Sequence, residues 1–371
     1  MYIKTLSLQN FRNYKSLTVH LNPGLNIFVG NNAQGKTNLL EAIYILSLSK
    51  SYRTGREVEL INHDENQAAI QARIKKMANL DLSIIVGKDA PKKLLVNNKG
   101  TTSNQFMGHL NSVLFTPDSL QLVKGSPGER RRFLDIQICQ IDPVYRTTLL
   151  KYQRVVRQRN SLLKNAIEQR SLLNQLPSWD EQLLSLGAKI MFRRQDIVET
   201  LQYHSKVSHG KISNEVEELT VIYEPFFAKA QKGKKYTLKE IENRFRQLLQ
   251  EKRQEEIRRA HTLLGPQRDD LVFTINDLDL RTYGSQGQQR TAVLSYILAE
   301  LELMHQETNE YPIVLLDDVM SELDKTRRND LVSILNDKAQ TIVTTTDLSN
   351  FTQEIIEKAS VFNISGGKII Q

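Results

Sequence analysis

One stretch decides the fold: LNIFVGNNAQGKT, residues 25–37. Its first five residues are mostly apolar and predict a buried strand, and the next eight match the pattern G-x-x-x-x-G-K-[ST]. The residues that follow, through Leu39 and Ile43, have helical periodicity. A glycine-rich turn between a strand and a helix lets backbone N–H groups point inward, and the start of the helix adds partial positive charge. The stretch is therefore expected to cradle the phosphates of a nucleotide.

The side chains at the end of this loop indicate magnesium-ATP. Lys36 would reach the β- and γ-phosphates, and the Thr37 hydroxyl would bind Mg²⁺. ATP and Mg²⁺ are therefore the expected cofactors. The residues expected to bind the nucleotide are Gly30, Asn31, Asn32, Ala33, Gln34, Gly35, Lys36 and Thr37.

A second apolar run, residues 312–316, ends in two carboxylates, Asp317 and Asp318. Such a run predicts a buried strand whose carboxyl end meets the ligand. Asp317 would hold Mg²⁺, directly or through water, and Asp318 would orient or deprotonate the attacking water. Alone, the pattern fits an ordinary core strand equally well. Beside a phosphate-binding loop, it indicates the acidic strand of an ATPase.

A third motif, residues 285–289 (SQGQQ), opens an expected helix. Ser285 and Gly287 would present a hydroxyl and backbone N–H groups to an anion, although a polar turn into a helix explains the same residues. The run has the signature form S-x-G-x-Q of ABC ATPases, and the Asp-Asp strand and residues 321–324 (SELD), which resemble the D-loop of those ATPases, follow it. In such proteins the signature of one subunit completes the ATP site of another. The resemblance therefore implies an ATP-dependent homodimer with two shared sites.

Composition excludes several classes of protein. No run of about 18 apolar residues predicts a membrane span, so no membrane partner is expected. Cys139 is the only cysteine, which excludes an internal disulfide and a Cys-x-x-Cys metal hook. Residues 2–8 alternate as a strand does, unlike a signal peptide. We therefore expect a reducing, cytoplasmic setting.

The positive charge is concentrated in the middle of the chain. The net charge is +8, yet residues 121–261 hold 27 of the 50 Lys and Arg residues and only 17 of the 42 Asp and Glu residues. The whole basic excess therefore lies in this segment. At this point a polyanion-binding surface and a solvated helical face explain it equally well.

The periodicity changes twice along the chain. Strand-like alternation dominates up to about residue 120, and helical periodicity dominates from 142 to 259. After that, strands and helices alternate, beginning with a hairpin expected at 271–275 and 278–283. The expected fold class is α/β, a P-loop NTPase head of the ABC/SMC type with a mainly helical inserted arm. We expect the head to comprise residues 1–120 and 262–371, and the basic insertion to comprise residues 121–261.

The length of the insertion points to one branch of these ATPases. Ser285 lies 248 residues after Thr37, a gap much longer than in ABC transporter subunits and typical of the SMC and RecF branch. Sustained heptads are absent, which disfavours the long coiled coils of SMC proteins. Five blocks resemble RecF proteins, the bacterial recombination mediators, and they extend along essentially the whole chain. These are residues 8–14 (LQNFRNY), 115–118 (FTPD), 125–135 (GSPGERRRFLD), 264–270 (LGPQRDD) and 366–368 (GGK).

The RecF resemblance implies a nucleotide contact from Arg12, for which an exposed strand-end arginine is the alternative. Three positions depart from relatives. Gln267 stands where His is common, and Thr346 stands where many ABC ATPases carry a histidine that senses the γ-phosphate. Residues 116–118 (TPD) replace the glutamine-bearing Q-loop of SMC relatives. We therefore expect a weak, DNA-stimulated ATPase whose slow hydrolysis suits a timed clamp.

Together with this resemblance, the excess of Lys and Arg in residues 121–261 indicates a surface that binds DNA. Lys and Arg contacts to phosphates give salt-dependent affinity with little sequence preference, and no zinc finger or helix-turn-helix pattern is present. We expect two heads to close on ATP and grip duplex DNA. The resemblance further implies action at gaps and single-strand/duplex junctions in recombinational repair, replication and the SOS response, with RecR and RecO as partners in loading RecA. The candidate contact residues are Arg130, Arg131, Arg132, Lys151, Arg154, Arg157, Arg159, Lys232, Lys234 and Lys235.

Three alternatives stay open at this point. An ABC-type ATPase coupled to a membrane transporter would need a helical docking segment soon after the phosphate loop. A head joined to a nuclease, as in phage defence, would need an acidic metal cluster beyond the head. A non-catalytic, ATP-gated clamp would close without hydrolysing, and the Thr346 departure leaves room for it.

Overall fold

The computed structural model describes residues 1–370 except 214, 229–232, 323–327, 329–330, 333 and 336–337. Three features of the sequence therefore lie outside the described residues. These are Lys232, half of the run that resembles a D-loop (Leu323 and Asp324), and most of residues 325–335, where we expect a helix. The chain forms two compact units, residues 1–119 with 300–371, and residues 120–299. Packing thus groups 262–299 with the helical unit, and their assignment to the ATPase head stays a prediction.

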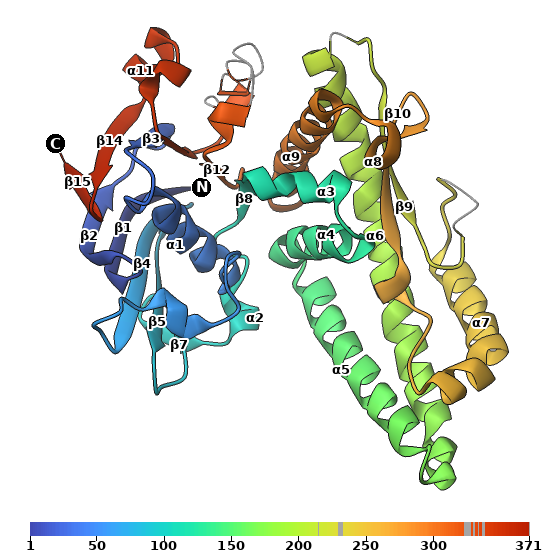
Figure 1. The fold of residues 1–371 in the computed structure, drawn as a ribbon. Helices are drawn as coiled ribbons and strands as arrows, with labels where there is room; N and C mark the ends of the chain where they lie inside the picture. Colours follow the sequence, from blue (N-terminus) through green and yellow to red (C-terminus); the bar gives the residue numbers. More distant parts are fainter. Residues whose placement is uncertain are drawn as a thin grey trace. The chain divides into compact units, whose positions relative to one another are not determined.

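The first unit contains two six-stranded sheets (Figure 1). One is antiparallel, and its strands alternate between buried and more exposed residues, as in β4, so it has one face toward solvent. Its order is β2 (Tyr14–His20), β1 (Tyr2–Phe11), β4 (Gln67–Lys75), β5 (Asn79–Gly87), β6 (Lys93–Val96) and β7 (Lys99–Thr101).

The second sheet is parallel except at one edge. Its order is β15 (Lys368–Ile370), β14 (Ser360–Ser365), β3 (Leu25–Val29), β13 (Thr341–Thr345), β12 (Ile313–Asp317) and β8 (Ser112–Phe115). Only β15 pairs antiparallel. Every residue of β3, β12 and β13 is buried, as expected for parallel strands covered on both faces. The strands predicted before the phosphate loop and before the two aspartates are thereby confirmed.

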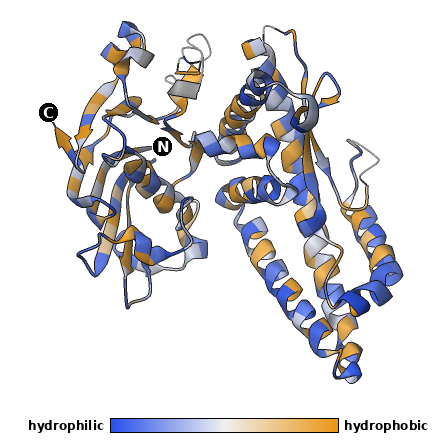
Figure 2. Cartoon of the chain, viewed as in Figure 1, coloured by the Kyte–Doolittle hydropathy of each residue, from blue (hydrophilic) through white to orange (hydrophobic). Residues whose placement is uncertain are grey.

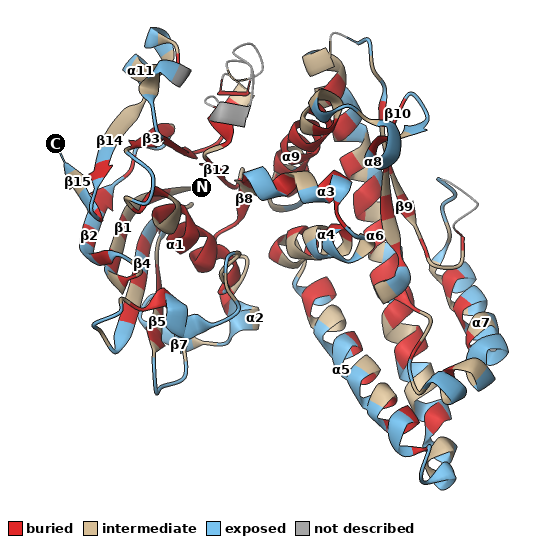
Figure 3. Ribbon diagram, viewed as in Figure 1, coloured by how far each residue is buried: buried red, intermediate tan, exposed pale blue. Residues whose placement is uncertain are grey.

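Helix α1 (Lys36–Leu48) contacts strands of both sheets, including β4 and β12. Eleven of its residues are buried, and Figure 3 shows this burial along almost its whole length. A helix that is buried nearly all round belongs in a core, and Figure 2 shows hydrophobic residues along the same helix. Among the described residues, this unit also contains the short helices α2 (Ser103–Phe106) and α11 (Gln353–Lys358).

The second unit is mainly helical, as predicted. Its helices are α3 (Gln121–Lys124), α4 (Pro127–Ile141), α5 (Pro143–Asn165), α6 (Leu176–Ser213), α7 (Leu238–Arg259), α8 (Leu280–Tyr283) and the first part of α9 (Gln286–Thr308). A three-stranded sheet in the order β11 (Leu278–Asp279), β10 (Asp270–Ile275), β9 (Leu219–Glu224) completes it. No helix in the described part of the chain is long and apolar enough to cross a membrane.

One strand prediction was wrong. Residues 278–283 form only a two-residue strand, and from Leu280 the chain turns into α8. The cause is local, because the Asp279 side chain accepts a hydrogen bond from the backbone N–H of Thr282 and caps the turn. Such a cap competes with strand pairing. By contrast, a capping box formed by Thr237 and Glu240 starts α7.

A buried arginine joins the elements of the second unit. Arg194 on α6 donates to Asp135 on α4 at 2.8 Å and to Asp269 at 3.2 Å. Tyr145 donates to Asp135 at 2.5 Å, and Tyr223 donates to Asp269. Arg194 and Asp269 are almost completely buried, so this network holds two of the RecF-like sequence blocks together.

Candidate nucleotide-binding site

The phosphate-binding loop joins the end of β3 to the start of α1. Ala33 and Gly35 have positive φ angles of 63° and 114°. A β-carbon on Gly35 would lie 2.6 Å from the side-chain nitrogen of Asn13, so both the backbone angle and the available space require glycine. Gly35 provides no side-chain cap, and the first turn of α1 has no acidic residue. The N–H groups at the start of α1 therefore suit an anion.

Lys36 folds back over this loop. Its Nζ donates hydrogen bonds to the backbone oxygens of Gly30 at 2.5 Å and Asn31 at 2.8 Å. Burial lowers the pKa of Lys36, while the nearby carboxylates of Asp318 and Asp317 oppose this shift. An ammonium group held by neutral carbonyl oxygens can exchange them for charged phosphate oxygens, which form stronger hydrogen bonds.

Asp317 lies beside Thr37, although 280 positions separate them in the sequence. The Thr37 hydroxyl donates to Asp317 Oδ1 at 2.9 Å, and the Thr344 hydroxyl donates to the same oxygen at 2.8 Å. The Tyr52 hydroxyl donates to Asp317 Oδ2 at 3.2 Å. Burial, followed by the charge of Asp317, raises the pKa of Tyr52, so its proton stays available for this hydrogen bond.

The oxygens of Thr37 and Asp317 fit magnesium. Mg²⁺ prefers oxygen ligands, and in nucleotide sites it takes one or two of them from the protein and the rest from phosphates and water. Within the described residues, no group of three or more His, Cys, Asp or Glu side chains could hold a metal ion. An ion at Thr37 and Asp317 would complete its coordination with oxygens of the nucleotide and of water.

Asp318 follows directly after β12 in a left-handed conformation, with φ at 54°. Its backbone N–H donates to the Thr344 hydroxyl at 3.0 Å, so Thr344 contacts both aspartates. Non-glycine residues seldom adopt this conformation, and they often do so at functional sites. The geometry turns the chain at the carboxyl end of the sheet, where parallel α/β sheets bind ligands.

Two neighbouring turns hold the phosphate loop. The Asn13 side-chain amide donates to Gln34 O at 3.0 Å, and the Tyr14 hydroxyl donates to Gly35 O at 3.0 Å. From the hairpin of β14 and β15, the N–H of Gly366 donates to Gln34 Oε1 at 2.7 Å, and the N–H of Gly367 donates to Gln34 O at 3.0 Å. Both segments belong to the RecF-like blocks, but no pattern in either of them indicates that it supports the loop.

Arg12 belongs to an ion-pair cluster around Glu41 of α1. It donates two hydrogen bonds to the buried Glu41 carboxylate, at 3.0 and 2.7 Å. Arg53 and the Ser51 hydroxyl also donate to Glu41, at 3.2 and 2.6 Å. The side chain of Arg12 is 18% exposed, so the cluster leaves part of it accessible, and its contact with a nucleotide stays a prediction. Nothing in the sequence singled out Glu41, Ser51, Tyr52 or Arg53.

The signature residues belong to the second unit. Ser285 precedes α9, where its hydroxyl accepts from the N–H of Gln288 at 3.2 Å and its own N–H donates to Gln288 Oε1 at 2.9 Å. Ser285 is exposed, and a β-carbon on Gly287 would meet only the Ser285 hydroxyl, at 3.9 Å. The helix start is therefore open to an approaching group.

The three positions at which we expect a departure from relatives have ordinary environments. Gln267 donates to Leu264 O at 2.8 Å and accepts from the Tyr152 hydroxyl. The backbone N–H of Thr116 donates to the Ser119 hydroxyl at 3.0 Å. Thr346 is exposed after β13. None of these contacts tests the rate of ATP hydrolysis, so slow hydrolysis stays a prediction.

The described basic candidates differ in their burial. Arg130 and Arg159 are buried, and each is bound by carboxylates: Arg130 by Asp270 at 2.7 Å, and Arg159 by Glu256 at 2.6 Å. Their inclusion among the expected DNA contacts was wrong, because adjacent arginines or a helical run of charges cannot reveal which members are engaged inside the fold. Exposed candidates remain on α4 and α5: Arg132, Lys151, Arg154 and Arg157.

Comparisons with known proteins agree on one group. The family model described as the RecF/RecN/SMC N-terminal domain matches residues 2–367. The chain is 42% identical to the DNA replication and repair protein RecF of Halothermothrix orenii, over 100% of this chain and 98% of that protein. It is 33% identical to the solved recombination mediator protein RecF-ATP of the RecFOR pathway, with a TM-score of 0.91 over 100% of this chain and 97% of that one. The Smc head domain of Pyrococcus furiosus, at 16% identity, a TM-score of 0.56 and coverage of 100% of this chain and 96% of that one, shows the shared fold alone.

Proposed function

The chain belongs to the RecF/RecN/SMC family, and within it to the RecF proteins, and on this premise we propose that it is an ATP-dependent DNA-binding protein of recombinational repair. Its work would extend to replication and the SOS response. The observation that carries the proposal is the convergence of Lys36, Thr37 and Asp317 around the start of α1. This arrangement lies in a chain with full-length similarity to proteins named for DNA repair.

In the proposed site, ATP lies along the loop of residues 30–37. Backbone N–H groups and Lys36 bind its phosphates, and Thr37 and Asp317 hold Mg²⁺. When bound, the ion supplies charge neutralisation and in-line orientation of the phosphates. Asp318 orients or deprotonates the attacking water. Thr344 positions both aspartates through the hydrogen bonds that its hydroxyl makes with Asp317 and with the backbone of Asp318.

The proposed switch is a homodimer. Ser285 and Gly287 at the exposed start of α9 would close the ATP site of a second copy, because the positive end of a helix attracts an anion such as the γ-phosphate. Two sites would then form together, and hydrolysis would release the dimer. Slow hydrolysis would give the closed state a long lifetime.

The proposed DNA surface uses the exposed cations of the helical unit. Lys151, Arg154 and Arg157 follow one another along α5 and are exposed. Arg132 adds a fourth exposed cation on α4. Phosphate contacts of this kind bind duplex DNA without reading its sequence. Binding at gaps and single-strand/duplex junctions, and help to RecR and RecO in loading RecA, complete the proposal by family membership.

The proposal is tested by duplex affinity measured against salt concentration, with ATP, with ADP and without nucleotide. We expect ATP to tighten binding, and the logarithm of affinity to fall with the logarithm of salt, with a slope of about −0.9 for each phosphate contact. Light scattering on the same samples should show a dimer with ATP and a monomer otherwise. Lys36→Arg provides the control, because it keeps the charge but should lose the ATP effect. A flat salt slope, or equal affinity in all nucleotide states, would reject the proposal.

A further inference from the structure

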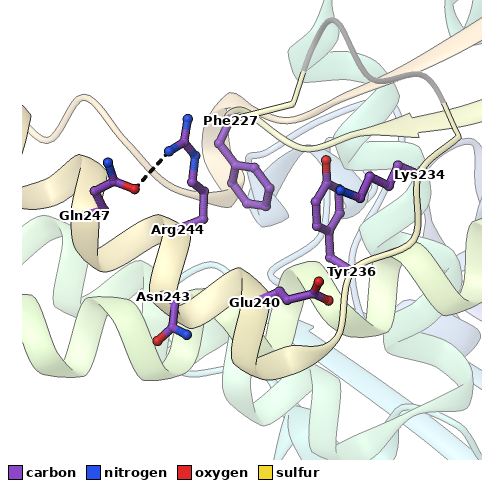
Figure 4. A pocket seen from close by; sticks show the side chains of 7 residues that line it. All are labelled: Phe227, Lys234, Tyr236, Glu240, Asn243, Arg244 and Gln247. Atoms are coloured by element: carbon purple, nitrogen blue, oxygen red, sulfur yellow. Dashed lines mark hydrogen bonds between the residues drawn. The ribbon is translucent and has the colours of Figure 1, made fainter.

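A mixed aromatic and basic pocket lies on the second unit at the start of α7 (Figure 4). Its volume is about 400 Å³, within the size range of small-ligand sites. The residues that line it are Phe227, Lys234, Tyr236, Glu240, Asn243, Arg244 and Gln247. None of them has a role in the proposed nucleotide site, so the pocket requires its own explanation.

Two aromatic rings form the apolar part of the pocket. The centroids of Phe227 and Tyr236 are 5.2 Å apart, and their planes are inclined by 80°, an edge-to-face pair. Both rings are half-buried and pack on the core cluster of Ala188, Met191 and Ile241. The core therefore fixes one side of each ring, while Figure 4 shows both rings bordering the open space. Rings held in this way are platforms for a planar group.

Two cations flank the rings. The Nζ of Lys234 lies 5.1 Å from the centroid of Tyr236, and Arg244 donates to Gln247 Oε1 at 2.9 Å. Both cations are exposed. The one carboxylate among the lining residues, Glu240, is turned to the start of α7, where its Oε2 accepts from the N–H and the hydroxyl of Thr237, both at 2.8 Å. An anionic group that approaches the rings would therefore meet Lys234 and Arg244.

The spacing on α7 explains why these side chains share one space. Residues 240, 243, 244 and 247 follow the spacing i, i+3, i+4, i+7, so they lie on one face of the helix. The exposed amide of Asn243 lies between Glu240 and Arg244 in the sequence of α7. An amide both donates and accepts hydrogen bonds, as the edge of a base does.

We propose that this pocket receives an unpaired nucleobase of single-stranded DNA. The base stacks on a face of Tyr236 beside Phe227, the adjoining phosphate meets Lys234 and Arg244, and the Asn243 amide meets the edge of the base. The inference rests on the proposed DNA-binding function and adds to it a place for the unpaired strand of a junction. A blunt duplex cannot use the pocket because its bases are already paired and stacked. A phosphorylated peptide could satisfy the cations but would leave the two rings without a planar partner.

The experiment compares three fluorescein-labelled DNAs by anisotropy, using the full chain with ATP. These are a blunt duplex, the same duplex with a single-stranded extension, and the extension alone. Tyr236→Leu keeps an apolar side chain against the core but removes the stacking ring, so we expect roughly tenfold weaker binding of both DNAs that have unpaired bases. Tyr236→Trp should restore wild-type binding, and Lys239→Ala, an exposed residue of α7 outside the pocket, should change nothing. Duplex affinity should be the same for all four proteins.

The possible outcomes separate this inference from the proposed function. If the wild type binds duplex with ATP but Tyr236→Leu binds the extension as tightly as the wild type, the pocket proposal is wrong and the clamp stands. Equal weakening of duplex and extension would also overturn it, since that would indicate a phosphate contact without a base. If no DNA binds at all, both proposals fail. Should Tyr236→Leu unfold, the pair Lys234→Ala and Arg244→Ala replaces it, and a 2-aminopurine base in the extension must lose fluorescence on binding to the wild type.

Discussion

Asp317 depends on hydroxyl groups from three separate segments. Thr37, Thr344 and Tyr52 all donate to it, and together they fix the direction in which its oxygens face. Groups that orient a metal ligand in this way usually matter nearly as much as the ligand itself. The proposed magnesium site is therefore larger than the two residues that the sequence motifs indicate.

Tyr52→Phe removes one of these hydroxyls and leaves the ring, which packs edge-to-face on Tyr44 at 5.1 Å. We expect magnesium-dependent ATP affinity to fall roughly tenfold, the lower end of the range for such supporting groups. ATP affinity measured in EDTA should not change. Titrations of a fluorescent ATP analogue with and without Mg²⁺ measure both. Tyr311→Phe is the matched control, because its hydroxyl bonds to Glu302, and an equal loss there would contradict the role of Tyr52.

Gly35 offers a second test of the loop. Its φ of 114° and the 2.6 Å approach of Asn13 leave no room for a side chain. Gly35→Ala should therefore destabilise the protein by about 1–3 kcal/mol and abolish nucleotide binding. Urea unfolding and ATP titration would measure the two effects. Gly55→Ala provides the comparison, since nothing lies within 4 Å of a β-carbon there, and similar losses at both positions would show that the loop geometry is not the cause.

Individual helices and strands could largely be predicted where one short sequence pattern determines them. The capping box of α7 and the apolar strand before the phosphate loop needed only local sequence. The hairpin at 278–283 failed because a single side chain, Asp279, caps a helical turn. Glu41 and Tyr52 were missed for a different reason. Their partners come from other segments, 10 to 29 positions away for Glu41 and 265 positions away for Tyr52, and such pairing leaves no pattern in either segment alone.

The elements of the helical unit depend on one buried charge. Arg194→Met would leave Asp269 without its counter-charge, and we expect a loss of about 3–5 kcal/mol in the free energy of unfolding. Asp269 is fully buried, and this burial raises its pKa to about 6 even with Arg194 nearby. Arg246→Met is the matched control, because the ion pair of Arg246 with Glu181 is exposed and should contribute less than about 1 kcal/mol.

The pH dependence of this variant has a definite sign. An aspartate in the unfolded chain releases its proton near pH 4, whereas a native aspartate with a raised pKa keeps it to higher pH. The free energy of unfolding therefore falls as pH rises from about 4 toward the native pKa. Without Arg194 the pKa of Asp269 rises further, and the fall extends to higher pH. Urea unfolding at pH 5 and pH 8 should therefore show a larger loss for Arg194→Met at pH 8. Adding Asp269→Asn should recover part of it, and equal losses at both pH values would rule out this account.

At the scale of the whole molecule, the proposed dimer makes a prediction that a monomeric ATPase cannot share. Lys36→Ala should inactivate the phosphate loop, and Ser285→Arg should block the signature of the same chain. If each site combines the loop of one copy with the signature of the other, a mixed dimer keeps one intact site and loses both halves of the second. Equal mixing should then restore about a quarter of wild-type ATPase activity, since half of the dimers are mixed and each has one of two sites. Either variant alone should stay inactive, and so should a mixture of Lys36→Ala with the double variant. A mixture of the two single variants that stays inactive, although native mass spectrometry shows mixed dimers, would mean that loop and signature act within one chain.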